Sequence, residues 1–142
     1  MRLPDVNILL YAFRDAAPEH EAYRTWVQTM VDGEEPFGLA DVVLSGFIRV
    51  ATHPRIWDPP ASVHEALAFV HALLGAPNAV RVAPGERHWE LFERMCLEGS
   101  ARGNLVSDAY LAALAIESGS ELVTADRDFG RFPGLRWRHP LR

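Results

Sequence analysis

The stretch of sequence that decides the fold is residues 121–132, ELVTADRDFGRF. It starts with an apolar run that includes Leu122 and Val123, and it then delivers two acids, Asp126 and Asp128. A short apolar run that ends in turn-forming residues indicates a buried strand. Asp is common in loops, so a simple turn would explain these two acids if they were alone. Further acids occupy related positions in the chain, and they point to a site.

The rest of the chain predicts strands that alternate with helices. Residues 2–13 predict a short strand followed at once by a helix, with Asp5 and Asn7 at the junction. Further strands are expected at residues 37–41, 79–84, 121–125 and 135–139, and helices at 18–33, 42–53, 60–75, 85–102 and 103–119. Such alternation predicts an α/β fold, a three-layer α/β/α sandwich with a central, mainly parallel sheet. The length of 142 residues predicts one domain.

The basic residues exclude several kinds of chemistry. All 14 are Arg, and the absence of Lys excludes a Walker-A phosphate loop, Schiff-base chemistry and any catalytic ammonium group. Residues 127–142 hold five Arg and one Asp, whereas the preceding residues hold nine Arg and 18 acids. This distribution fits either a solvated C-terminal tail or a basic rim beside an acidic centre. An enzyme that acts on polyanions needs such a basic rim to attract its substrate.

An acid interrupts the most apolar helix. Of the residues 105–116, only Ser107 and Asp108 are not apolar. Helical spacing puts Asn104 and Leu111 beside Asp108, which predicts a half-buried carboxylate in the first helical turn, where the helix dipole favours an anion. An unpaired buried charge is costly, so Asp108 must be paired, protonated or metal-bound. A helix cap and the partner of a buried Arg are the structural alternatives.

Asp5, Asp108 and Asp126 are expected to meet at one edge of the sheet, because ligands of such sheets bind beyond the carboxyl ends of the strands. Two carboxylates about 4 Å apart repel by roughly 4 kcal/mol at an effective dielectric of about 20. A hard cation such as Mg²⁺ would offset this repulsion, and carboxylates, waters and phosphates are its usual ligands. It would also activate a water and neutralise charge on a phosphodiester. The pattern therefore predicts metal-assisted hydrolysis.

Three segments resemble a known family. They are PDVNILLYAF (residues 4–13), GNLVSDAYLAALAIESGSELVTADRDFGRF (103–132) and FPGLRWRHPL (132–141). Together they resemble PIN-domain ribonucleases, specifically the VapC-type toxins of VapBC toxin–antitoxin pairs. The resemblance implies a single PIN domain over residues 1–142 and a Mg²⁺-dependent endoribonuclease, with Mn²⁺ able to substitute, that is the toxin of a type II toxin–antitoxin system. It also implies an RNA substrate, a cognate VapB-like antitoxin and a homodimer.

The resemblance assigns roles to individual residues. The implied metal ligands are Asp5, Asp108 and Asp126, and Asp128 joins them in the catalytic set. Polar residues expected to support the site are Asn7, Thr124 and Ser45. The arginines expected to contact RNA are Arg127, Arg131, Arg136 and Arg138.

The helix expected at residues 42–53 departs from the family pattern. Family members usually carry a Glu there, in a pattern like T-L-x-E, and this chain has Gly46 at the position that we align with it. Asp41 is off the same helical face and could reach the site only from the preceding loop, while Ser45 could offer a hydroxyl through water. We interpret Gly46 as a feature of a subgroup, because the other acids are intact; weak metal binding is the alternative.

Two other functions were weighed against the nuclease. A haloacid-dehalogenase-type phosphatase also places an Asp after its first strand, but it needs an acid two residues later, where this chain has Asn7, and a Lys, which is absent. A catalytically weakened PIN-like module that binds RNA or protein is the second alternative, and its RNA binding would survive chelation. The six His show no spacing that predicts a metal site.

The sequence also indicates a compartment. Cys96 is the single cysteine and excludes an internal disulfide, and no apolar run approaches the roughly 18 residues of a membrane span. The N-terminal segment does not resemble a signal peptide, so we expect a cytoplasmic protein without membrane contact. Within residues 85–102, Trp89, Phe92 and Cys96 are spaced for one helical face, and Cys96 is predicted to be buried.

Overall fold

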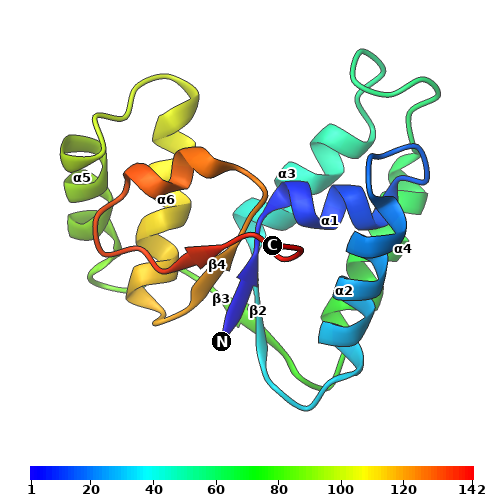
Figure 1. The fold of residues 1–142 in the computed structure, drawn as a ribbon, viewed down its shortest axis with the longest axis horizontal. Helices are drawn as coiled ribbons and strands as arrows, with labels where there is room; N and C mark the ends of the chain where they lie inside the picture. Colours follow the sequence, from blue (N-terminus) through cyan, green and yellow to red (C-terminus); the bar gives the residue numbers. More distant parts are fainter.

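The computed structural model describes all 142 residues and contains a five-stranded sheet whose pairings are all parallel. The strands are β1 (Arg2–Pro4), β2 (Phe37–Ala40), β3 (Ala79–Val82), β4 (Glu121–Val123) and β5 (Trp137–Arg138). The helices are α1 (Val6–Phe13), α2 (His20–Asp32), α3 (Asp41–Ala51), α4 (Val63–Leu74), α5 (His88–Glu98) and α6 (Asn104–Glu117). Helices α5 and α6 lie on one side of the sheet and α1 to α4 on the other (Figure 1). The predicted three-layer α/β/α sandwich is confirmed.

The strand order places a crevice beside β1. The order is β3-β2-β1-β4-β5, so the chain begins in the middle of the sheet, builds outward through β2 and β3, and then returns to the other side of β1. In register, Leu3 of β1 lies opposite Leu122 of β4, and Pro4 lies opposite Val123. Ligands of open parallel sheets bind where the order reverses, outside the carboxyl ends of the strands. That point is the end of β1 and β4.

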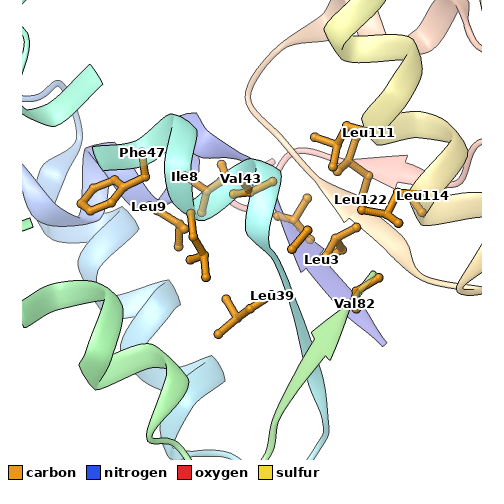
Figure 2. Close-up of a cluster of buried hydrophobic side chains, with 14 of the residues drawn as sticks. Leu3, Ile8, Leu9, Leu39, Val43, Phe47, Val82, Leu111, Leu114 and Leu122 are labelled. Atoms are coloured by element: carbon orange, nitrogen blue, oxygen red, sulfur yellow. The ribbon is translucent and has the colours of Figure 1, made fainter. Parts of the chain in front are cut away.

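The core fills both faces of the sheet. Leu3 and Leu122 are 0% exposed, as expected for strands covered by helices on both sides. Figure 2 shows Leu111 and Leu114 of α6 beside Leu122, while Phe47 of α3 lies in the layer on the other side. Full burial of a side chain of this size contributes about 1.5–3 kcal/mol relative to exposure. The packing fixes α6 and α3 on opposite sides of the crevice.

Two of the helices, α1 and α4, begin at polar side-chain caps. Asp5 caps α1, because its carboxylate accepts the N–H of Val6. Helix α4 begins after Ser62, which forms a capping box with Glu65, and not at Pro60 as the sequence suggested. No helix combines the length and the apolar character that a membrane crossing requires.

Two local expectations were wrong, and one element was not predicted. Helix α5 buries His88, Leu91 and Met95, whereas Trp89 is 63% exposed and Cys96 is only half-buried. Trp89 directly follows the buried His88, and Cys96 directly follows the buried Met95. One position along a helix turns the side chain by about 100°, which takes both residues away from the buried face. Asp108 is in the second turn of α6, not the first, because the helix begins at Asn104. The residues after β4 form a 3₁₀ helix, η1 (Arg127–Arg131), that no pattern predicted.

Candidate active site

Asp5 lies at the carboxyl end of β1, and its backbone N–H donates to the carbonyl of Val123 on β4 at 2.9 Å. Its carboxylate is nearly buried, and it accepts hydrogen bonds from the N–H of Val6 at 2.7 Å, from Thr124 Oγ1 at 2.8 Å and from Asn7 Nδ2 at 3.0 Å. A carboxylate has about four acceptor positions, so about one stays free, on Oδ1. Burial raises the pKa of Asp5, and these hydrogen bonds partly oppose that rise.

Asn7 and Thr124 join the loop after β4 to the start of α1. Asn7 Nδ2 donates to Thr124 Oγ1 at 3.2 Å, and Asn7 Oδ1 accepts the N–H of Ala125 at 3.1 Å. Thr124 is fully buried, and its Oγ1 also accepts the N–H of Asp126 at 3.1 Å. Two of the three predicted supporting residues, Asn7 and Thr124, thus lie beside Asp5, and they fix where Asp126 leaves the sheet.

Asp126 caps the 3₁₀ helix η1. Its Oδ1 accepts the N–H of Asp128 at 2.9 Å, while its Oδ2 makes no hydrogen bond. Asp commonly forms a turn of this kind. The simple turn that the sequence suggested for Asp126 therefore accounts for its Oδ1. The second oxygen is free for a ligand. Asp128 is exposed, and it lies close enough to raise the pKa of Asp108.

Asp108 faces this group from α6. Its carboxylate is half-buried, makes no hydrogen bond or ion pair, and caps no helix, so neither structural alternative for it holds. Burial is the main cause that raises its pKa to about 6, followed by the negative charges of Asp126, Asp5 and Asp128; Arg131 opposes the rise. An acid whose pKa is raised by burial and by specific charged neighbours, and which lines a cleft, is a candidate for a functional site.

One cavity joins these groups. It has a volume of about 710 Å³ and is lined by Asp5, Asp108 and Asp126; we call it the acidic cavity. Its other polar lining residues are Asn7, Ser45, Arg49, Asn104 and Ser107. A second cavity of about 920 Å³, at α1 and α2, contains none of the predicted site residues and is therefore not the candidate site.

The chemistry of the donors fits a hard divalent cation. Three carboxylates line the acidic cavity, and each keeps at least one free acceptor position: one on Oδ1 of Asp5, Oδ2 of Asp126 and both oxygens of Asp108. Oxygen ligands of this kind suit Mg²⁺ or Mn²⁺, and not the metals that prefer sulfur or nitrogen. The donors do not form a ready-made centre, because no group of three or more His, Cys, Asp or Glu side chains lies close enough to hold a metal ion. Binding would require the carboxylate of Asp108, which makes no hydrogen bond, to rotate toward Asp5 and Asp126, which hydrogen bonds hold in place.

Helix α3 forms the opposite wall of the acidic cavity. Gly46 lies on it, together with Ser45 and Arg49. Asp41 does not reach the cavity, which corrects the suggestion that it could replace the missing Glu; it is the first residue of α3 and pairs with Arg81 on β3. Helix α3 therefore contributes no carboxylate to the acidic cavity.

The arginines expected to contact RNA lie outside the acidic cavity. Three of them have other partners: Arg131 donates to the carbonyl of Gly99 at 3.1 Å, Arg136 to that of Gly119 at 2.7 Å, and Arg138 pairs with Glu121 at 2.9 Å. Arg127 is exposed. Their contact with RNA stays a prediction.

Sequence reasoning gave no role to two lining residues, Asn104 and Ser107, and it considered a third, Arg49, as either a phosphate contact or a surface ion pair. Asn104 and Ser107 lie on the same α6 face as Asp108, and Arg49 lies on α3 with Gly46. The available signal was spacing along the helix: Asn104 is four residues from Asp108, and Arg49 is four from Ser45. Ser107 is directly before Asp108 and had no such signal. Spacing identifies neighbours on one helix, whereas the meeting of α3 with α6 across the crevice is a property of the folded chain.

Comparison with known proteins agrees with this geometry. The PIN domain family model matches residues 2–135. Ribonuclease VapC43 of Mycobacterium tuberculosis is 48% identical over 137 residues, which cover 96% of this chain and 93% of that protein. Ribonuclease VapC25 of the same organism is 38% identical over 140 residues, 99% of each chain.

Solved structures show the same fold. VapBC2 from Rickettsia felis, bound to a DNA fragment from its promoter, superposes with a TM-score of 0.69 at 17% identity and covers 97% of each chain. VapC20 of Mycobacterium tuberculosis, a toxin that cleaves the sarcin-ricin loop, gives a TM-score of 0.65 at 12% identity, with 96% of this chain and 99% of that chain covered. The chain therefore belongs to the PIN-domain family, within its group of VapC-type toxin ribonucleases.

Proposed function

We propose that this protein is a Mg²⁺-dependent endoribonuclease that hydrolyses RNA phosphodiester bonds, with Mn²⁺ able to substitute, and that it acts as the toxin of a type II toxin–antitoxin pair. One observation carries the proposal: three carboxylates from separate segments line one cavity, and their mutual repulsion helps to raise the pKa of Asp108 to about 6. Folding alone gives no reason to gather these charges, whereas a divalent cation does.

Asp5, Asp108 and Asp126 would hold the cation. When bound, it would supply a water of lowered pKa and would neutralise charge that develops on the phosphodiester. Thr124 and Asn7 hold Oδ2 of Asp5 and thereby leave Oδ1 as the donor. At Asp126, Oδ1 accepts the N–H of Asp128, and Oδ2 stays free for the cation. Asp108 has no hydrogen-bond partner, and it can rotate toward either acid.

The partners that we propose are RNA, a cognate VapB-like antitoxin and a second copy of the chain. Solved relatives of the same fold include complexes of VapB with VapC. An antitoxin must offset three carboxylates to block the acidic cavity, so it would present a basic side chain there. Co-purification with the product of the adjacent reading frame is the direct check of this partner.

A catalytically weakened binding module is the second candidate function. Two observations favour it: Gly46 supplies no acid from α3, and the carboxylates are not gathered at metal-binding distances. Such a module would bind RNA equally well with and without a chelator. The enzyme would lose cleavage when the divalent cation is removed.

The test is incubation of total RNA with the purified protein in Mn²⁺, with EDTA and Asp5→Ala reactions in parallel. We expect discrete fragments that disappear in both controls, because each removes the cation from the acidic cavity. Intact RNA in the presence of folded wild-type protein would overturn the nuclease proposal. RNA bound but uncut, with or without EDTA, would establish the binding module.

A further inference from the structure

Most arginines of the chain already have a partner. Nine of the 14 guanidinium groups pair with an acid or donate to a backbone carbonyl. The five without such a partner are Arg49, Arg55, Arg87, Arg102 and Arg127. Among these five, only Arg49 lines the acidic cavity. It is the single basic residue in the lining, opposite three acids.

Arg49 belongs to the α3 wall. It follows Gly46 by three residues and Ser45 by four, so the three lie on one helical face, and all three line the acidic cavity. Although Asp5, Asp108 and Asp126 line the same cavity, Arg49 forms no ion pair with any of them. The cation that lowers the pKa of Asp108 is Arg131. The charge of Arg49 is therefore free for another anion.

Gly46 leaves the wall open beside Arg49. A Cβ at Gly46 would lie 3.1 Å from Val6 Cγ2, which is tighter than ordinary van der Waals contact. Gly46 lines the acidic cavity and adds no side chain to the α3 wall beside Arg49.

We propose that Arg49 binds a backbone phosphate of single-stranded RNA in the acidic cavity, at the wall that Gly46 leaves open. The proposal rests on the proposed function, since it names how that site holds its substrate. A phosphodiester is repelled by three carboxylates, and a cationic donor opposite them offsets part of that repulsion. A guanidinium matches phosphate oxygens with two parallel hydrogen bonds, which an ammonium does not reproduce. The α3 wall thus binds substrate, while the β1–β4 edge binds the cation.

A structural role for Arg49 predicts a different result. Arg49 lies in the last turn of α3, where a cation stabilises the helix dipole by about 0.3–1 kcal/mol. Loss of that role would lower the melting temperature slightly and leave RNA affinity unchanged. RNA binding and its dependence on salt therefore separate the two roles.

The test measures binding of a fluorescein-labelled, mixed-sequence single-stranded RNA by fluorescence anisotropy over a series of salt concentrations, in EDTA. All proteins carry Asp108→Asn, which prevents cleavage and removes one repelling charge. Arg49→Gln is compared with Arg55→Gln, which removes the same charge from an exposed residue outside the cavity. We expect Arg49→Gln to weaken binding about tenfold and to lower the salt slope by about 0.7, the value for one phosphate contact of a single strand.

Arg49→Lys completes the comparison. We expect it to restore the salt slope, because the charge is kept, and to restore only part of the affinity, because the two parallel hydrogen bonds are lost. Equal affinity and equal slope for Arg49→Gln and Arg55→Gln would overturn the inference and leave the nuclease proposal intact. Absence of RNA binding by every variant would overturn the inference about Arg49. Cleavage of total RNA by the wild type in Mn²⁺ tests the nuclease proposal separately.

Discussion

The two walls of the acidic cavity are built in different ways. On the β1–β4 edge, Asp5, Asn7, Thr124 and Asp126 form a connected set of hydrogen bonds, most of it partly or fully buried, between segments more than 100 residues apart. On the α3 wall, Ser45 makes only a 3.5 Å contact with the carbonyl of Val42, and the side chain of Arg49 makes none. The comparison suggests that the first wall holds fixed donors for a cation, and that the second adapts to the substrate.

Loss of an acid should have the largest effect. We expect Asp108→Asn to lower RNA cleavage about 100-fold or more, because even residues that only orient metal ligands contribute roughly 10–100-fold. Asp128→Asn should cost much less, since Asp128 is exposed and does not line the cavity. The measurement is kcat/KM on one RNA substrate in Mn²⁺. Equal losses for the two variants would remove Asp108 from the metal site.

Thr124→Val tests the connected wall. Thr124 is fully buried, and its Oγ1 joins Asp5, Asn7 and the N–H of Asp126. Removal of the hydroxyl leaves the N–H of Asp126 without a partner and takes one hydrogen bond each from Asp5 and Asn7, so we expect a loss of about 2 kcal/mol in the free energy of unfolding. Ser45→Ala, on the other wall, should change it by less than about 0.5 kcal/mol. Urea unfolding measures both, and equal values would contradict the difference between the walls.

Gly46→Glu places an acid on the α3 wall. We expect Mn²⁺ to bind several-fold more tightly, because a fourth carboxylate would enter the acidic cavity. The new side chain must also displace Val6, whose Cγ2 lies 3.1 Å from the added Cβ. Calorimetric titration with Mn²⁺ measures the change. Unchanged affinity would show that the alignment of this helix with the family pattern is wrong.

The pH dependence of stability should give the smallest effect. The folded protein holds the pKa of Asp108 at about 6 instead of 3.8, so ionisation costs stability as the pH rises through that window. Because Asp108 is half exposed, we discount the effect to roughly 1 kcal/mol. Without divalent cations, Asp108→Asn should therefore be more stable than the wild type at pH 7.5 and close to it near pH 4. Urea unfolding at the two pH values checks this, and a destabilised variant at pH 7.5 would contradict it.

The acids of the site could be predicted from sequence because they follow directly from strand positions. Asp5 and Asp126 follow apolar strands, and parallel strands end at one edge. Asp108 was recognisable as an acid within an apolar helix. Strand positions do not predict that Thr124 is the common hydrogen-bond partner of Asp5, Asn7 and the N–H of Asp126, because that role depends on contacts across the sheet.

The α3 wall and the surface of α5 show the limits of sequence patterns. The place of Arg49 opposite the acids depends on how α3 packs against the sheet, which periodicity does not specify. The buried face of α5 was misjudged because aromatic residues were assumed to point inward, whereas Trp89 is 63% exposed. Helical periodicity identifies a face, and tertiary packing decides which face is covered.

The measurement that tests the central claim most directly is Mn²⁺ binding by calorimetry to the wild type, Asp126→Asn and Asp128→Asn. Asp126 lines the acidic cavity with a free oxygen, whereas Asp128 lies outside it, and both substitutions remove one charge. We predict one site in the wild type, loss of most of the affinity in Asp126→Asn and near wild-type affinity in Asp128→Asn. No Mn²⁺ binding by the wild type, or equal affinities in all three proteins, would contradict a metal site at this edge of the sheet.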